Sequence, residues 1–216
     1  MDFAAARRNM VESQVRPNRV TDERLIAAMA TLPREAFVPK ELRGIAYVDE
    51  AIPLGEGRYL MEPMIVARLI QTAAPTAGDL ALTIGCGTGY AAAVLSHAVG
   101  TVVALESNAA LARQATRTLA DMGIDTVAVI EGALADGCRD QAPFDVIFFD
   151  GAVAEIPESV SSQLAEGGRL VAVVAADGAG KGVLMTRRRG ILTSREVFDG
   201  GTPLLPGFQR RTAFAF

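Results

Sequence analysis

The stretch Leu80-Ala-Leu-Thr-Ile-Gly-Cys-Gly-Thr-Gly-Tyr90 decides the fold of this chain. An apolar run from Leu80 to Ile84 leads into three glycines, at positions 85, 87 and 89, and then into the alanine-rich segment 91–98. We interpret this order as a strand, a glycine turn and a helix, which together form the front of a nucleotide-type cofactor site. Glycine permits the tight turn and the close approach of a ligand, and the helix N-terminus offers free N–H donors.

A second apolar run, from Thr101 to Leu105, ends at an acid, Glu106. An acid at the end of the second strand is placed to accept both ribose hydroxyls of an adenosine. The alternative is that Glu106 only supplies negative charge at the start of a helix, ahead of Asn108. Because strand, turn, helix, strand and acid follow in the expected order, the sequence favours the ribose role.

The rest of the chain alternates between apolar runs and helical patterns, which predicts an α/β fold. Expected strands are 80–84, 101–105, 126–130, 145–149 and 169–175. Continuous apolar strands separated by helices, one of them from Pro157 to Gly167, indicate a parallel sheet covered on both faces. Strand-like stretches at 183–186, 191–198 and 211–216 lack long helices between them, so we expect an antiparallel C-terminal edge. We expect one domain over 1–216, in which a helical and loop region (1–76) precedes a Rossmann-like core (77–216).

Composition limits the classes of partner. The chain has 216 residues, a net charge of −4 and an estimated pI of 5.1, which argues against nucleic acid because a nucleic-acid footprint needs a basic face. No apolar run approaches the ~20 residues that span a bilayer, and no signal peptide opens the sequence, so we expect a cytoplasmic protein without a membrane partner. The two cysteines, at 86 and 138, have no metal-binding spacing.

Four further stretches occur in a specific order: Asn9–Gln14, Leu32–Pro39, Ala46–Gly55 and Gln163–Leu170. Together with the G-x-G-x-G turn, they resemble the protein-L-isoaspartate O-methyltransferase family over nearly the whole chain. The resemblance implies a Rossmann-like methyltransferase fold, with a mostly parallel seven-stranded sheet and an antiparallel last pair. It also implies S-adenosylmethionine as methyl donor, S-adenosylhomocysteine as product and a protein or peptide carboxylate as acceptor.

The resemblance also assigns cofactor-binding residues. The glycines of the turn would cradle the methionine part, Glu106 would hold the ribose, and the segment after the third strand would border the adenine. The residues expected to bind the cofactor are therefore Gly85, Cys86, Gly87, Gly89, Tyr90, Glu106, Ser107, Gly132 and Ala133.

The acceptor loop departs from the family pattern. The family loop reads G-x-G-Q-T-I-S-Q-P, whereas this chain has Gly55-Glu-Gly-Arg-Tyr-Leu-Met-Glu-Pro63. Tyr59 stands where Thr is expected, and Met61 where the family has the Ser central to its site. Thr83 replaces the acid that opens the glycine motif, and Ala133 replaces an Asp. Isoaspartyl repair is therefore not carried over directly.

Four residues are candidates for the acceptor side of the site. Met61 would form an apolar wall, and Tyr59 a wall or a hydrogen-bond donor. Arg58 would hold an acceptor carboxylate, or it is an ordinary solvent-exposed loop arginine. Asp150 replaces an uncharged residue of the family. It would act as the base for a hydroxyl or amine acceptor, and Glu62 could serve in the same role. The alternative is that Asp150 only caps a turn. A carboxylate acceptor needs no base, since it is ionised at pH 7.

Three functional hypotheses follow. The first is an S-adenosylmethionine-dependent methyltransferase related to the isoaspartyl enzymes, acting on a protein carboxylate or, with its altered loop, on another acceptor such as an unknown small molecule. The second is a binding or regulatory protein that keeps the cofactor pocket without transferring methyl groups. A third, a nicotinamide oxidoreductase, is disfavoured because Tyr90 stands where the dinucleotide pattern has its last glycine.

Overall fold

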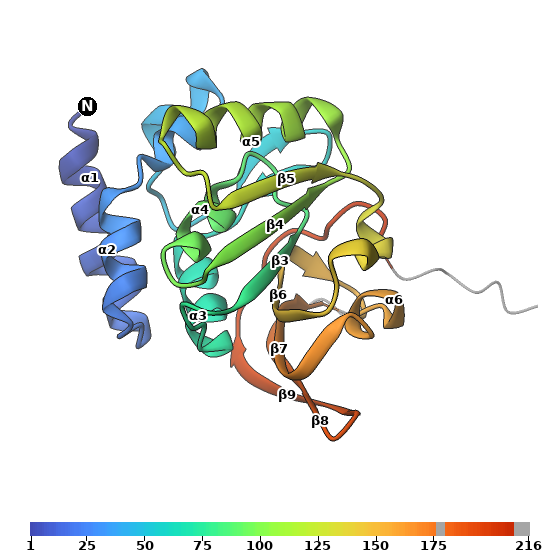
Figure 1. The fold of residues 1–216 in the computed structure, drawn as a ribbon. Coiled ribbons are helices and arrows are strands. Elements are labelled where there is room, and N and C mark those ends of the chain that lie inside the picture. Colours follow the sequence, from blue (N-terminus) through green and yellow to red (C-terminus); the bar gives the residue numbers. More distant parts are fainter. Residues whose placement is uncertain (176–179, 210–216) are drawn as a thin grey trace, which may run out of the picture.

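The computed structural model describes residues 1–175 and 180–209, and its centre is a seven-stranded sheet (Figure 1). The strand order is β5-β4-β3-β6-β7-β8-β9, with parallel pairing from β5 to β7 and antiparallel pairing across β7, β8 and β9. The bounds are β3 Leu80–Ile84, β4 Thr101–Glu106, β5 Val127–Glu131, β6 Phe144–Val153, β7 Leu164–Val174, β8 Lys181–Arg188 and β9 Ile191–Asp199. This confirms the predicted sheet and its antiparallel edge. The strand expected at 211–216 lies outside the described residues.

The helices are short, and most lie on one side of the sheet (Figure 1). They are α1 Phe3–Met10, α2 Glu23–Thr31, α3 Pro63–Ala73, α4 Tyr90–Ser96, α5 Ala109–Asp121 and α6 Glu158–Ser161. A π-helical turn and a 3-10 turn extend α1, at Val11–Val15 and Arg16–Asn18, and further 3-10 turns lie at Arg34–Phe37, Lys40–Ile45, Leu134–Asp136 and Arg139–Gln141. Within the described residues, none of these helices combines the length and the apolar character that crossing a bilayer would require.

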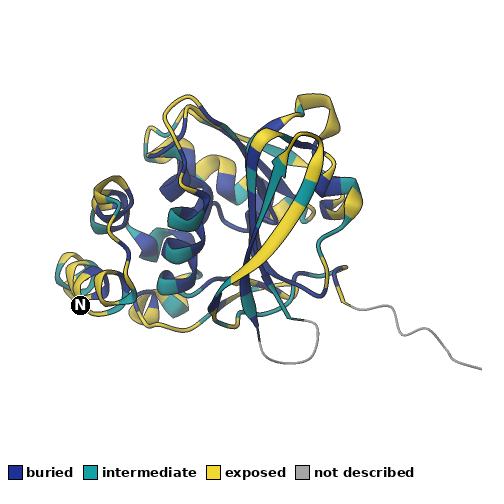
Figure 2. Ribbon diagram, turned by 90° about the horizontal axis from the view of Figure 1, so that it is seen from below, coloured by how far each residue is buried: buried dark blue, intermediate teal, exposed yellow. Residues whose placement is uncertain are grey.

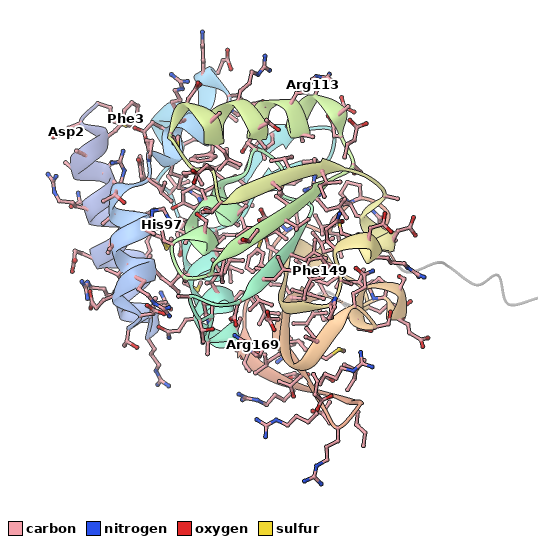
Figure 3. All side chains as sticks on the ribbon, in the orientation of Figure 1. Asp2, Phe3, His97, Arg113, Phe149 and Arg169 are labelled. Atoms are coloured by element: carbon pink, nitrogen blue, oxygen red, sulfur yellow. The ribbon has the colours of Figure 1, made fainter. Side chains whose placement is uncertain are left out.

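The apolar core has two layers, one on each face of the sheet. The larger layer joins α1 to α4 and part of α5 to one face, and the smaller lies between the other face, α6 and the segment 203–208. Figure 2 shows the buried positions concentrated between the helices and the strands, while β9 presents an exposed surface at the edge. Arg169, labelled in Figure 3, ties β7 to the end of α3 by donating to the Ala73 carbonyl (2.9 Å) and pairing with Asp79.

Two segments differ from the sequence prediction. The acceptor loop expected at Gly55–Pro63 is largely part of a hairpin, β1 Ile52–Gly55 and β2 Arg58–Leu60. The hairpin forms because residues 55–57 all adopt positive φ, which allows a sharp reversal. The helix expected after Pro157 has only four residues, because the Gln163 amide donates to the carbonyls of Asp136 and Ser159 (2.7 Å each) and redirects the chain into β7.

The structure gives Gly89 a packing role that predicts a stability effect. Gly89 has φ of +98°, and a Cβ there would lie 3.3 Å from Leu119 and 3.4 Å from Ala115 of α5. Gly89→Ala should therefore lower the free energy of unfolding by about 1–3 kcal/mol, through backbone strain and crowding against α5. Urea denaturation monitored by circular dichroism would measure the change.

Gly44→Ala is the matched control, because a Cβ at Gly44 meets no atom within 4 Å and its φ is not positive. It should change the free energy of unfolding by no more than about 0.5 kcal/mol. Equal effects of the two substitutions would contradict the packing role of Gly89.

Candidate active site

The predicted site residues meet at the carboxyl ends of β3, β4 and β6. After β3 the chain continues to β4 on one side of it, while β6 lies on the other. This is a topological switch point, the place where open α/β sheets bind ligands. The glycine turn after β3 lies here, and the β1–β2 hairpin and the segment 202–205 enclose the same space.

Glu106, at the end of β4, is the fully buried anion of this site. Its Oε1 accepts hydrogen bonds from the backbone N–H groups of Ser107 (2.8 Å) and Asn108 (3.0 Å), and its Oε2 accepts from Gly87 N–H (2.7 Å). These three bonds fix the carboxylate between the glycine turn and the start of α5. The turn therefore presents Glu106 to the site as an oriented acceptor.

Arg58 of β2 completes the bonding of Glu106. Its side chain is 2% exposed, and its Nη2 donates to Glu106 Oε2 (3.0 Å) and to the Gly85 carbonyl. A Cβ at Gly85 would lie 2.7 Å from this Nη2, so the guanidinium lies against a surface that only glycine leaves open. The alternative that Arg58 is a solvent-exposed arginine is wrong, because period-two alternation along β2 turns it inward.

The four predicted acceptor-side residues line one small cavity of about 10 Å³. Arg58, Met61 and Asp150 are buried, whereas Tyr59 is 37% exposed because it lies on the outer face of β2. The cavity is about the size that one water molecule needs. The structure thus brings together the residues that the sequence singled out, in a space that is nearly filled.

The segment 202–205 forms the far wall of this cavity, and sequence reasoning did not find it. It is held by backbone hydrogen bonds from Ala152 N–H to the Pro203 carbonyl (2.9 Å) and from Leu205 N–H to the Ala152 carbonyl (2.8 Å). Phe208 packs edge-to-face on Phe149, labelled in Figure 3, with ring centroids 5.7 Å apart. Leu205 covers Gly85 from this side, since a Cβ at Gly85 would lie 2.9 Å from Leu205 Cδ2.

An open cavity of about 390 Å³ lies beyond Glu106, at the ends of β4 and β5. It is lined by Leu105, Ile130, Glu131, Gly132 and the segment 136–141. Gly132 therefore borders this cavity, and Ala133 follows it as an exposed residue. Their place beside the adenine stays a prediction. Ser107 is an exposed residue next to Glu106, and its hydroxyl donates a long hydrogen bond to Glu106 Oε1 (3.4 Å).

The remaining residues of the predicted cofactor set build the turn. Leu54 of β1 lies over Gly87, where a Cβ would be 3.0 Å from Leu54 Cδ1. Cys86 is buried, and burial raises the pKa of its thiol well above the usual value, which makes it an unreactive thiol. Tyr90 is also buried, with its ring edge-to-face against Phe37 (5.3 Å), and Gly89 faces α5.

His97, at the far end of α4, lies on the side of α1 and α2 (Figure 3).

Arg34 anchors the acceptor loop, a role that the sequence did not assign. It is completely buried, donates from Nε to the Ala46 carbonyl (2.7 Å) and from Nη2 to the Met61 carbonyl (2.6 Å), and stacks on the Tyr90 ring at 4.7 Å. Its position in the family-like stretch Leu32–Pro39 was the available signal. A buried arginine that holds the carbonyl of Met61 fixes where the hairpin leaves the site.

Two carboxyl groups near the cavity have raised pKa values. Burial raises the pKa of Asp150 to about 7, with Glu106 adding to the rise and the Arg58 and Arg34 charges opposing it. Burial likewise raises the pKa of Glu62, at the N-cap of α3. Asp150 is therefore able to hold or release a proton near neutral pH.

Comparisons with known proteins agree with this geometry. The sequence model of the protein-L-isoaspartate(D-aspartate) O-methyltransferase family matches residues 5–197. Protein-L-isoaspartate O-methyltransferase 1 of Rhodopseudomonas palustris is 42% identical over 175 residues, which cover 81% of this chain and 71% of that protein. The protein-L-isoaspartate O-methyltransferase of Methylorubrum extorquens is 42% identical over 189 residues, covering 88% and 82%.

Solved structures confirm the fold. A protein-L-isoaspartate O-methyltransferase structure superposes with a TM-score of 0.81 at 26% identity, covering 94% of this chain and 67% of that one. A β-aspartate methyltransferase from Plasmodium falciparum, in complex with S-adenosyl-L-homocysteine, superposes with a TM-score of 0.75 at 19% identity, covering 92% and 97%. These findings confirm the methyltransferase hypothesis against the oxidoreductase. The chain belongs to the protein-L-isoaspartate O-methyltransferase family of S-adenosylmethionine-dependent methyltransferases.

Proposed function

We propose that this chain transfers a methyl group from S-adenosylmethionine to a carboxylate of a damaged protein, the isoaspartyl side chain being the first candidate. The observation that carries the proposal is the buried Glu106 carboxylate, which the glycine turn presents at the switch point between β3 and β6. Relatives at about 42% identity bear the name of this activity, which supports the same reaction class for this chain.

The residues of the site fit this cofactor at its adenosine end and at its methionine end. Glu106 and the Gly85 carbonyl are acceptors for the donor groups of a ribose and an ammonium, and the cavity of about 390 Å³ beside Gly132 has room for a base. At the methionine end, Arg58 and Leu205 cover Gly85. The donor and acceptor set therefore fits the cofactor, provided that the Arg58 side chain is displaced and the Leu205 side chain shifts.

The chemistry requires little from the side chains beyond positioning. S-adenosylmethionine, when bound, supplies a methyl group activated by a sulfonium. An acceptor carboxylate is ionised at pH 7, so the site needs no base but has to hold the acceptor in line with the methyl group. Met61 and Leu205 would exclude water from the methyl group, and the buried Arg34 would keep the carboxyl end of the acceptor loop in place through the Met61 carbonyl.

A second candidate function is supported by Asp150. A buried carboxyl group with a pKa of about 7 is suited to accept a proton from a hydroxyl or amine acceptor, which a carboxylate acceptor does not require. Methylation of such an acceptor, or binding of the cofactor without transfer, are the alternatives to isoaspartyl repair. The altered loop residues Tyr59 and Met61 are consistent with a different acceptor.

Transfer to an isoaspartyl peptide is the direct test. Protein shown by equilibrium dialysis to bind S-adenosylmethionine should transfer a labelled methyl group to a peptide that contains isoaspartate. The same peptide with ordinary aspartate should remain unlabelled, which makes it the matched control. A loaded protein that labels neither peptide would rule out the repair activity, and the neutral-acceptor or binding-only function would then lead.

Met61→Ser tests whether the loop can be returned to the family pattern. A hydroxyl that orients the acceptor contributes about 1 kcal/mol, so isoaspartyl transfer should rise roughly fivefold in Met61→Ser, with or without Tyr59→Thr. Met61→Ala creates a similar space without the hydroxyl and should show no such gain. No difference between the Ser and Ala variants would mean that the surrounding pocket has been rebuilt for another acceptor.

Asp150→Asn tests the protonation of the buried carboxyl group. The folded protein keeps the Asp150 proton up to about pH 7, whereas the unfolded chain releases it near 3.8. The unfolded state therefore binds fewer protons between these values, and stability falls as the pH rises from about 4 to about 7. At about 1.4 kcal/mol for each pKa unit, the loss is at most about 4 kcal/mol.

Urea denaturation from pH 4 to pH 8 would show this loss as a difference between variants. Asp150→Asn should become more stable relative to wild type as the pH rises, and the gain should level off above pH 7. Asp121→Asn, at an exposed position, should leave the wild-type pH dependence unchanged. Parallel pH profiles for Asp150→Asn and wild type would be evidence that Asp150 ionises normally.

A further inference from the structure

Arg58 takes the hydrogen-bond acceptors that a cationic cofactor would need. Its Nη2 bridges the Gly85 carbonyl and Glu106 Oε2. With the backbone N–H groups of Gly87, Ser107 and Asn108 and a long bond from the Ser107 hydroxyl (3.4 Å), it brings the donors to the Glu106 carboxylate to five. A carboxylate has about four lone-pair sites, so little acceptor capacity remains for another ligand.

The same side chain occupies the space in front of the glycine turn. A Cβ at Gly85 would lie 2.7 Å from Nη2 and 3.0 Å from Nη1, so no ligand atom fits there while Arg58 keeps this position. The cavity at this end is about 10 Å³, against about 390 Å³ at the Gly132 end. One end of the site is therefore open and the other is closed by part of the protein itself.

Arg58 and Leu205, which both cover Gly85, are held in place by different contacts. Leu205 is fixed by backbone hydrogen bonds to β6, whereas Arg58 belongs to a three-residue strand of a separate two-stranded sheet. Its Nε and Nη1 are buried without a hydrogen-bond partner among the described residues. Unsatisfied buried donors weaken the closed arrangement, and rotation of the Arg58 side chain would free the acceptors of Gly85 and Glu106. The flexible end of the Leu205 side chain, 2.9 Å from the Cβ position of Gly85, would have to shift as well to clear the space.

We propose that Arg58 is an internal competitor of the cofactor: its guanidinium occupies the acceptors of Gly85 and Glu106, and S-adenosylmethionine binds only after this side chain is displaced. The inference rests on the proposed cofactor of the site and adds the residue that limits its affinity. In the displaced state Asp150 is the nearby carboxyl partner, since it lines the same cavity and already experiences the Arg58 charge.

Arg58→Gln tests the competition directly, because it introduces the neutral residue that stands at this position in the family loop. Isothermal titration calorimetry with S-adenosylmethionine and S-adenosylhomocysteine should give a Kd at least tenfold lower for Arg58→Gln than for wild type. Arg43→Gln removes the same charge from an exposed position and should leave the Kd within twofold of wild type. Thermal melts without ligand establish that both variants are folded.

An unchanged or higher Kd in Arg58→Gln would overturn the competitor role, and so would the absence of binding to every variant. The labelled-methyl assay separates this failure from failure of the proposed function. Tighter cofactor binding by Arg58→Gln without methyl transfer to the isoaspartyl peptide would contradict only the proposed acceptor. Methyl transfer with an unchanged Kd for the cofactor would contradict only the competitor role of Arg58.

A measurement on the wild-type protein decides the matter if Arg58→Gln fails to fold. At saturating S-adenosylhomocysteine, backbone amides of the hairpin 52–60 should exchange with deuterium faster than in the free protein, because the hairpin loses the Arg58 contacts to Gly85 and Glu106. Slower exchange in this hairpin would mean that Arg58 stays in place or gains contacts, and the proposal would fall.

Discussion

The arrangement of the site depends on the buried carboxylate of Glu106. An isolated ionised carboxylate in a protein interior costs several kcal/mol, so the surrounding chain has to supply donors. Three come from backbone N–H groups of the glycine turn and the start of α5, a longer bond (3.4 Å) comes from the Ser107 hydroxyl, and one comes from Arg58 of the hairpin. One anion therefore joins three segments that are far apart in the sequence: the β1–β2 hairpin, the turn after β3, and the junction of β4 with α5.

The atoms that stabilise the buried Glu106 carboxylate are also the atoms that surround the proposed cofactor site. The backbone donors to Glu106 lie in the glycine turn and in the junction between β4 and α5, so they can leave only if the backbone moves. Arg58 is the charged donor that can leave without changing the backbone, because it is a side chain on a short hairpin. A ligand that offers its own donors can therefore replace Arg58 while the fold stays intact, and the cost of binding is confined to one ion pair.

Much of the core could be predicted from the sequence, because its signals are local. Apolar runs, positive-φ glycines and the acid at the end of β4 specify the parallel sheet and the turn without reference to distant residues. The missed features are non-local: the burial of Arg58, the anchoring of the Met61 carbonyl by Arg34, and the placement of Leu205 over Gly85. Apart from the family-like stretch around Arg34, the residue types give no local signal for these positions, since an arginine or a leucine is ordinary in a loop. If β2 had been predicted as a strand, the alternation of side chains along it would have indicated that Arg58 points inward and Tyr59 outward.

Charge balance explains why the departures at positions 58 and 150 belong together. The closed site holds Glu106 with Arg58, while Asp150 keeps a proton up to about pH 7 in its buried place. A cofactor with a sulfonium and an ammonium would bring further positive charge to this site. If the Arg58 guanidinium moves from Glu106 towards Asp150, its positive charge favours the ionised form of Asp150. The positive charge of the cofactor is then matched by the new negative charge on Asp150. The uncharged residue expected at position 150 could not supply that anion, so the arginine and the aspartate form one exchangeable pair rather than two unrelated substitutions.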